Sequence, residues 1–383
     1  MSGSVYDLLE KWNVKHYTVI TMEDLEDITV GSTLLATGGG GDPDIGFLWA
    51  QRMIKNSNDI VLIDPLDIPD DELITSVGCL GAPLVLTEKP PGGKEIFKSL
   101  DTVSNFLDKK VNAIIPAEAG GVNMTIPMAV AGALGIPVID ADGMGRAFPE
   151  LQMTSFYIGG VSPTPVAATN EKEEVCLVDS ADGQLAERII RSAAMAYGGI
   201  SWISCYPMTG KDMKRTSIHR TVTQARTIGQ IVRKYRENNI EPVNEVAKYM
   251  NGNLVFKGKV VDLNRDFGSE VTSGFSSGTI VMEGIDSYKG STAKIMFQNE
   301  WLHLTIDGKT RSLPPDLIIL MDPETGQALR TDIIKYGYRG YVLLIPADEK
   351  MTTEKGIEVC GPRAFGIDED YHSLESLNLF GDN

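Results

Sequence analysis

The first part of the sequence alternates short apolar runs with longer segments of helical spacing, and this alternation constrains the fold more than any other feature. The apolar runs end at Gly, Pro or Asp, as buried strands do. We expect strands at Thr33–Thr37, Asp59–Asp64, Glu72–Val77, Val111–Pro116 and Pro137–Asp140. We expect helices at Pro43–Lys55, capped by Asp42, at Lys94–Leu107 and at Met124–Leu134. Strands joined by helices pair in parallel, so we predict an α/β domain whose mostly parallel, Rossmann-like sheet carries helices on both faces.

The second part of the sequence has a different character. A connector rich in Pro, Thr and Ala, Val161–Lys172, suggests a domain boundary, which we place between an α/β domain at 1–165 and a second domain at 166–383. A short strand at Val175–Asp179 and helices at Asp182–Tyr197, Arg220–Arg236 and Pro242–Met250 are expected next. From about residue 252 onward, short runs separated by Gly, Asp and Pro predict β-strands, so the second domain is expected to be α+β with a β-rich second half.

Composition excludes several classes of protein. A net charge of -17 disfavours partners with phosphate backbones and anionic membrane surfaces, so we expect no nucleic acid and no membrane. The four cysteines lie far apart without a CxxC pair, which favours a reducing compartment over a disulfide scaffold. The longest nearly apolar run, Ile126–Ile139, is too short to span a bilayer, and residues 1–16 lack the order of a signal peptide. We therefore expect a cytoplasmic protein that forms a homo-oligomer and acts on a small molecule.

Four consecutive glycines, Gly38, Gly39, Gly40 and Gly41, precede Asp42 and a predicted helix. Glycine lets backbone N–H groups approach a ligand closely, and a helix N-terminus favours an anion. We therefore assign these five residues to substrate binding, against the alternative of a tight turn. A dinucleotide fingerprint is disfavoured because Pro43 stands where its third glycine should be, so no nucleotide cofactor is favoured, although Asp64 lies where a ribose-binding acid would.

A second motif, Pro116–Asn123, also joins a predicted strand to a predicted helix. Glu118 follows the carboxyl end of the strand, where open α/β sheets bind their ligands, so we assign it to catalysis. Asn123 is assigned to substrate binding, with a helix cap as the equal alternative. Cys79 follows another strand, but no His lies near it in sequence, so a small residue lining the loop is favoured over a nucleophile.

The third motif spans Asp140–Met153. Asp140 and Asp142 share one side of a strand, where two carboxylates either share a proton or bind a divalent cation, which leaves a metal open. We assign both to catalysis. Arg146 is expected to hold a substrate carboxylate or to pair with the aspartates in a structural network, and Glu150 and Gln152 are assigned to substrate binding.

The motifs TGGGGDP, PAEAGGVN, DADGMGRAFPELQM, PPDLI and GPRAFG occur in this order, within a resemblance that extends from about Thr21 to Tyr371. Together they resemble the S-methyl thiohydantoin desulfurase-like family, which is associated with hydantoinase and oxoprolinase systems. The resemblance implies an N-terminal α/β domain, a C-terminal domain with a large β component, and action on a hydantoin-like five-membered ring. Cys79 is not part of the resemblance.

Hydrolysis of such a ring needs a base to activate water, an acid to help the leaving group, and donors for negative charge on the ring carbonyl. Glu118, Asp140 and Asp142 are the expected proton carriers, the Gly38–Gly41 amides the donors, and Arg146 the residue that orients the substrate. Two other functions stay open. The protein could be a non-catalytic accessory or ligand-binding subunit that binds a hydantoinase or oxoprolinase-type subunit, or it could be a nucleotide-dependent enzyme.

Overall fold

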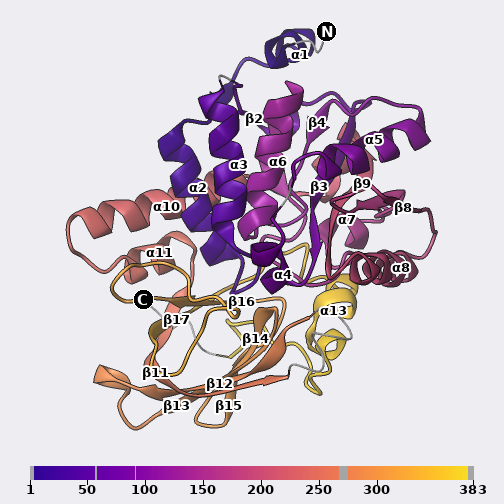
Figure 1. The fold of residues 1–383 in the computed structure, drawn as a ribbon. Helices are drawn as coiled ribbons and strands as arrows, with labels where there is room; N and C mark the ends of the chain where they lie inside the picture. The colour runs from indigo at the N-terminus through magenta and orange to yellow at the C-terminus, as the bar shows by residue number, and fades with distance from the viewer. Residues whose placement is uncertain (1–3, 57, 91, 267–274, 378–383) are drawn as a thin grey trace.

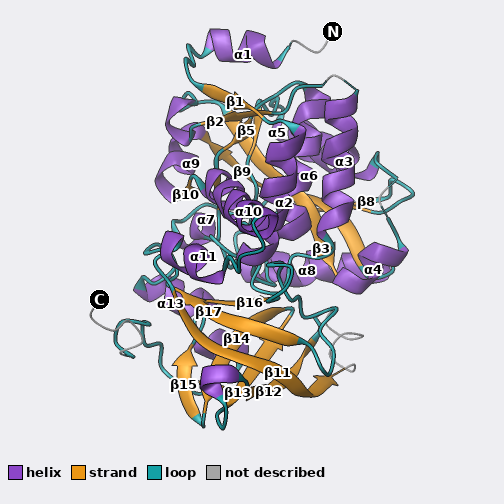
Figure 2. Cartoon of the chain, turned by 90° about the vertical axis from the view of Figure 1, so that its left-hand side faces the viewer, coloured by secondary structure: helices purple, strands orange, loops and turns teal. Residues whose placement is uncertain are grey.

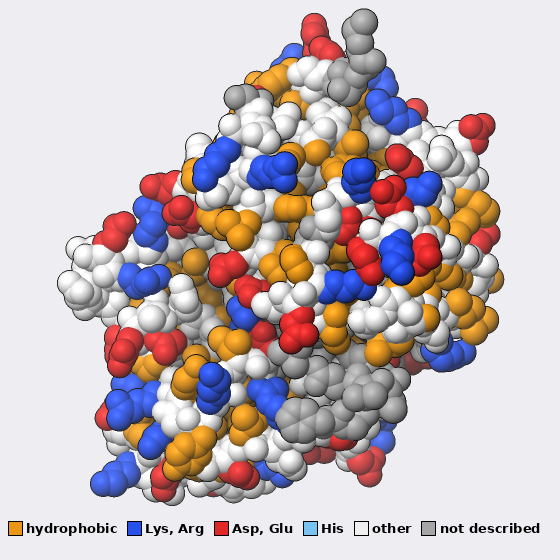
Figure 3. Space-filling view, viewed as in Figure 1, with side chains coloured by type: hydrophobic (Ala, Val, Ile, Leu, Met, Phe, Trp, Pro, Cys, Tyr) orange, Lys and Arg blue, Asp and Glu red, His pale blue; other side chains and the backbone are white. Residues whose placement is uncertain are grey.

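The structure, a computed structural model, describes residues 4–56, 58–90, 92–266 and 275–377. An upper part of helices packed on one sheet contains most of the first half of the chain (Figure 1). A lower part consists of a second, curled sheet. The helices of the upper part also lie above this sheet when the view is turned by 90° (Figure 2). Lys and Arg side chains alternate with Asp and Glu over the face drawn in Figure 3, where no continuous basic patch is seen.

The upper sheet has eight strands in the described residues, in the order β1-β2-β5-β4-β3-β9-β7-β8. They are β1 (Tyr17–Val19), β2 (Val61–Ile63), β3 (Leu73–Gly81), β4 (Ala113–Ile114), β5 (Val138–Ile139), β7 (Val166–Thr169), β8 (Val175–Val178) and β9 (Ile200–Thr209). The central strands β2, β5, β4 and β3 run parallel, whereas β1, β9, β7 and β8 each pair antiparallel. The sheet is therefore mixed, and the prediction of a mostly parallel sheet is wrong.

The longest strand of the upper sheet that the sequence did not predict is β9, which pairs along the whole length of β3; β1 and β7 are shorter strands that were not predicted. A proline inside a run argues against a central strand, and β9 contains Pro207. The structure accommodates this proline at an irregularity in the pairing, between Ile74 and Ser76 of β3. Tyr206, just before the proline, has a positive φ of 52°, so the strand is kinked there and the ladder loses no central hydrogen bond to the proline.

The four longest helices between residues 20 and 135 have 13 or 14 residues each, and the sequence predicted all but the first of them. They are α2 (Met22–Leu35), α3 (Pro43–Lys55), α5 (Glu95–Leu107) and α6 (Gly121–Leu134). Asp42 caps α3 by accepting a hydrogen bond from the Asp44 N–H, as predicted. The predicted strand Thr33–Thr37 is wrong, because its residues end α2, which begins at a capping box of Thr21 and Asp24. An apolar run of this length cannot be assigned to a strand or to a buried helix by periodicity alone.

The described residues also contain eight further α-helices and a two-stranded sheet. The helices are α1 (Val5–Lys11), α4 (Pro83–Glu88), α7 (Ser155–Ile158), α8 (Gly183–Ala196), α9 (Gly210–Thr216), α10 (Thr221–Glu237), α11 (Val243–Tyr249) and α13 (Glu354–Cys360). The small sheet pairs β6 (Ala141–Asp142) with β10 (Ile218–His219). None of the helices in the described ranges is long and apolar enough to cross a membrane. The domain boundary at residue 165 stays a prediction, and it would divide the strands of the upper sheet between two units.

The lower sheet is antiparallel and curls into a half-barrel of seven strands in the described residues, in the order β15-β14-β13-β12-β11-β17-β16. Its strands are β11 (Asn253–Asp266), β12 (Ser277–Gly284), β13 (Thr292–Gln298), β14 (Glu300–Ile306), β15 (Lys309–Ser312), β16 (Leu317–Met321) and β17 (Arg339–Ile345). Phe256, Ile280, Ile295 and Trp301 fill its concave side. The predicted β-rich segment from about residue 252 is confirmed.

We expect Gly229→Ala to destabilise the protein, because α2 and α10 cross at van der Waals distance. A Cβ at Gly229 would lie 2.0 Å from the backbone oxygen of Asp27, and backbone cannot move aside as a flexible side chain can. Overpacking costs about 1–3 kcal/mol, whereas alanine gains about 1 kcal/mol over glycine in a helix, so the free energy of unfolding should fall overall. Urea denaturation would measure this, with the exposed neighbour Gln230→Ala as control. A Gly229→Ala protein as stable as the control would contradict the close helix contact.

Candidate active site

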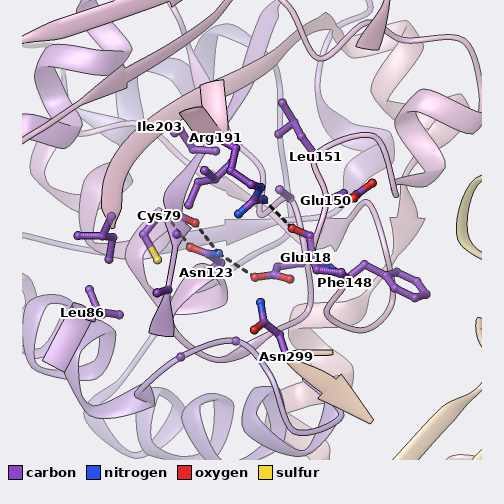
Figure 4. Close-up of a pocket in the computed structure, with 18 of the residues that line it drawn as sticks. Cys79, Leu86, Glu118, Asn123, Phe148, Glu150, Leu151, Arg191, Ile203 and Asn299 are labelled. Carbon is purple, nitrogen blue, oxygen red and sulfur yellow. Dashed lines mark hydrogen bonds between the residues drawn. The ribbon is translucent and has the colours of Figure 1, made fainter. Parts of the chain in front are cut away.

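A pocket of about 110 Å³ lies where the upper sheet, the glycine loop and the lower sheet meet (Figure 4). Each of the three predicted motifs contributes to it: Gly40 and Gly41 from the first, Ala117, Glu118 and Asn123 from the second, and Met144 and 148–151 from the third. The other lining residues were not assigned from the sequence. They are Cys79–Ala82, Leu86, Arg191, Ile200, Ile203, Cys205, Asn299 and Glu300.

Glu118 lies in the loop between β4 and α6, and its side chain is almost fully buried at the pocket. This loop is held by the next motif, because Gly143 donates to the Ala117 carbonyl at 3.1 Å and Ala119 donates to the Arg146 carbonyl at 3.2 Å. Burial raises the pKa of Glu118 from 4.5 to about 8, although the amide of Asn123 opposes this rise by donating a hydrogen bond. Glu118 is therefore an acid that changes protonation near neutral pH, which suits proton transfer.

Glu300 is the first residue of β14 and faces the same pocket from the lower sheet. Its Oε2 is buried without a hydrogen-bond partner among the described residues. Burial first, and then the charge of Glu118, raise the pKa of Glu300 well above its ordinary value, while the nearby Arg146 opposes the rise. The charge of Glu118 thus makes Glu300 harder to ionise, so Glu300 keeps its proton when Glu118 is ionised.

The four glycines connect the two parts of the molecule. Trp301 donates its N–H to the Thr37 carbonyl at 2.7 Å, and Thr331 donates to the Gly38 carbonyl at 2.9 Å. Only Gly40 and Gly41 reach the pocket, whereas Gly38 and Gly39 lie behind it against β14. Asp42 does not line the pocket; it caps α3 and lies 3.9 Å from Arg330.

The two aspartates predicted to carry protons lie outside the pocket. Asp142 is fully buried and accepts hydrogen bonds from the N–H groups of Met144 and Gly145 at 2.9 Å. Asp140 accepts from the N–H of Thr223 at 2.9 Å and from its hydroxyl at 2.5 Å, so it caps α10 from a neighbouring segment. Both carboxyl groups bond to backbone that they hold in place, and neither lines the pocket, although the charge of Asp142 raises the pKa of Glu118.

Arg146 is fully buried and also lies outside the pocket. Its five N–H groups make five hydrogen bonds, to Thr37 Oγ1 and to the carbonyl oxygens of Ala147, Trp301, Pro315 and Asp316. A guanidinium has no further donor, so Arg146 has nothing left to offer a substrate. The cation that lines the pocket is instead Arg191, which no motif indicated.

Arg191 lies on α8 and is fixed on two sides. Its Nε bonds to Glu187 one helical turn away, and its Nη2 donates to the Pro149 carbonyl at 2.8 Å. The guanidinium also stacks on the Phe275 ring, 4.2 Å from its centroid. Glu150 lines the pocket, whereas Gln152 lies behind it and donates from its amide to Glu150.

The two cysteines that line the pocket are not suited to act as nucleophiles. Cys79 and Cys205 line it, and burial raises the pKa of each thiol to about 12. The thiolate is the reactive form of cysteine, so both residues stay unreactive near neutral pH. Within the described residues, no three His, Cys, Asp or Glu side chains come close enough together to hold a metal ion.

Two sequence models of one family match the chain: the S-Me-THD-like N-terminal domain over residues 23–180 and the S-Me-THD-like C-terminal domain over residues 180–374. The chain belongs to the S-Me-THD-like family. This confirms the S-methyl thiohydantoin desulfurase-like family that the order of motifs indicated. No curated protein matches the chain.

The fold of this S-Me-THD-like chain is similar to that of a solved structure. The crystal structure of a protein from Chromobacterium violaceum superposes with a TM-score of 0.76. The comparison covers 94% of this chain and 100% of that one, at 18% sequence identity. At this identity the likeness extends to the fold alone.

The raised pKa of Glu118 predicts a pH-dependent stability. The folded protein keeps the Glu118 proton up to about pH 8, whereas the unfolded chain loses it near the ordinary value of 4.5. Between these two values the folded state binds more protons, so the free energy of unfolding falls as the pH rises. Glutamine carries no such proton. We therefore expect Glu118→Gln to gain stability over the wild type progressively between about pH 5 and pH 9.

Urea denaturation at several pH values would measure this gain. The control is Glu26→Gln, which removes an exposed glutamate of α2. A difference between wild type and Glu118→Gln that does not change with pH would show that Glu118 ionises as an ordinary surface glutamate does.

Proposed function

We propose that this protein is a hydrolase that acts on a hydantoin-like five-membered ring and removes the methylthio group of an S-methyl thiohydantoin with an activated water molecule. The observation that carries the proposal is the pair of Glu118 and Glu300, two buried carboxyl groups that face one small pocket from different parts of the chain. Membership of the S-Me-THD-like family supports a thiohydantoin-related substrate.

The reaction needs one group to take a proton and another to give one. The oxygen of water adds to the ring carbon that carries sulfur, and one water proton goes to the base. The carbon–sulfur bond then breaks, the ring C=N bond forms again, and the sulfur leaves as methanethiol with a proton from the acid. The hydroxylated ring shifts its remaining proton to nitrogen and becomes a hydantoin carbonyl. Passage of a proton from the base to the acid restores the enzyme.

We assign the base to Glu118 and the acid to Glu300. Asn123 donates to Glu118 Oε1 at 2.7 Å, which favours the ionised form of Glu118. Glu300 has no such donor on Oε2, and the charge of Glu118 keeps its pKa raised. The environments of the two groups thus differ in the direction that separates a base from an acid.

Three groups are available to orient the ring. Arg191 presents its guanidinium at one side of the pocket, and Asn299 lies next to Glu300 at the other (Figure 4). Gly40 and Gly41 expose backbone at the wall, where the N–H groups make no hydrogen bond to another described residue. Such donors suit negative charge that develops on a ring carbonyl in the transition state.

The position of the glycine loop bears on the alternative that the protein is a nucleotide-dependent enzyme. A dinucleotide fingerprint needs its glycine loop to follow a strand, so that the loop lies at the edge of the sheet. Here the loop follows the helix α2 and docks on the lower sheet through Thr37 and Gly38. This context does not favour a nucleotide, so the hydrolase is the better-supported proposal.

We expect Glu118→Gln and Glu300→Gln each to lower turnover of a methylthio-substituted hydantoin about 10²–10⁴-fold, the usual loss for a general acid or base. The measurement is release of methanethiol by the purified protein alone, which also distinguishes an enzyme from an accessory subunit. The matched control is Asp140→Asn, which removes a buried carboxylate outside the pocket and should keep most of the turnover. Full activity of both glutamine variants, or loss of activity only in the control, would overturn the assignment.

A further inference from the structure

We propose that Asn123 is a positioning residue for Glu118 rather than a ligand of the substrate: the backbone of Cys79 locks its amide, and the locked amide holds the Glu118 carboxyl group. This inference rests on the proposed role of Glu118 as the base. It reassigns a residue whose sequence context suggested a substrate contact or a helix cap.

The cap is excluded by the position of Asn123 in its helix. Helix α6 begins at Gly121 with Gly120 as its N-cap, so Asn123 lies inside the first turn. Its side chain leaves the helix and crosses to β3, the strand that forms another wall of the pocket (Figure 4).

Asn123 meets the Cys79 backbone with both ends of its amide. Its Oδ1 accepts from the Cys79 N–H at 2.8 Å, and its Nδ2 donates to the Cys79 carbonyl at 3.2 Å. This reciprocal pair determines which end of the amide is oxygen and which is nitrogen. The second N–H of Nδ2 is then directed to Glu118 Oε1 at 2.7 Å. All of the donors and the acceptor of Asn123 are thus directed to the protein.

A glycine provides the space for this arrangement. A Cβ on Gly78 would lie 2.6 Å from Asn123 Oδ1, which is closer than such atoms approach one another. The backbone of Gly78 does not have a positive φ, so alanine could adopt it. A side chain has no room at position 78 because the Asn123 amide lies against it. The substitution Gly78→Ala would therefore displace the amide without removing it.

The hydrogen bond from Asn123 affects the pKa of Glu118. A donor that points at a carboxylate stabilises its ionised form, and Asn123 is the side chain that opposes the effect of burial on the pKa of Glu118. Without this donor the base would hold its proton to a higher pH. The Glu118 carboxyl group would keep the backbone hydrogen bond from Phe148 but lose the side-chain contact that orients it.

The test compares Asn123→Ala and Gly78→Ala with Asn105→Ala, which changes an exposed asparagine of α5. We expect the acidic limb of the kcat/KM pH profile to move up by about one to two units in Asn123→Ala, the shift that corresponds to one lost hydrogen bond to a charged group. Gly78→Ala should move it in the same direction by less, and Asn105→Ala should not move it.

A readout independent of catalysis separates this inference from the proposed function. The infrared carboxyl band that disappears in Glu118→Gln reports Glu118 directly, and its titration midpoint should rise in both Asn123→Ala and Gly78→Ala. If it rises in protein that has no activity on a thiohydantoin, the positioning role holds and the proposed function fails. If the midpoint stays unchanged while KM rises, Asn123 contacts the substrate and the inference is wrong.

Discussion

One buried arginine determines how the two sheets of this protein meet. Arg146 comes from the loop after β6, and four of its five hydrogen bonds go to Thr37 at the glycine loop and to Trp301, Pro315 and Asp316 in the lower part. Burial lowers its pKa to about 10, so it stays charged near neutral pH although no carboxylate pairs with it directly. Its carbonyl accepts from Ala119, next to Glu118, and its guanidinium holds the carbonyl of Trp301, next to Glu300. The distance between the two pocket carboxyl groups thus depends on this one side chain.

The two buried carboxyl groups of the pocket, Glu118 and Glu300, work against the stability of the fold. A buried carboxyl group is stable when it is neutral or well paired. Burial raises the pKa of both groups, and the charge of Glu118 makes Glu300 harder still to ionise. The surrounding backbone is held by other groups, because Asp142 accepts a hydrogen bond from the loop after β6 and Asp140 accepts one from Thr223 in the first turn of α10. The aspartates that the sequence suggested as catalysts therefore support the site without entering it.

The sequence alone predicted what depends on local pattern. It predicted α3, α5, α6 and the β-rich segment, because capping residues and periodicity act over a few residues, and it predicted the loops that line one side of the pocket. It missed Glu300 and Arg191, since nothing near either residue in the chain reveals that folding brings it to Glu118. It assigned Arg146 to the substrate because the sequence shows that a guanidinium is present but not that all five of its donors are used.

The glycine run shows most clearly how a motif can be recognised correctly and still be explained incompletely. A Cβ on Gly38 would enter the Trp301 indole, one on Gly39 would lie 1.9 Å from Glu300 Oε1, and one on Gly40 would lie 2.9 Å from the backbone of Gly120 and Gly121. Three of these glycines are therefore required by three different neighbours, two of which belong to the lower sheet. A Cβ on Gly41 would lie 3.3 Å from the flexible side chain of Leu86, and its φ of 71° disfavours other residues. The motif thus marks the place where the two parts join, and Glu300 reaches the pocket only because Gly39 has no side chain. The pocket and the junction between the two parts are the same structure, so neither part of the chain forms the candidate active site by itself.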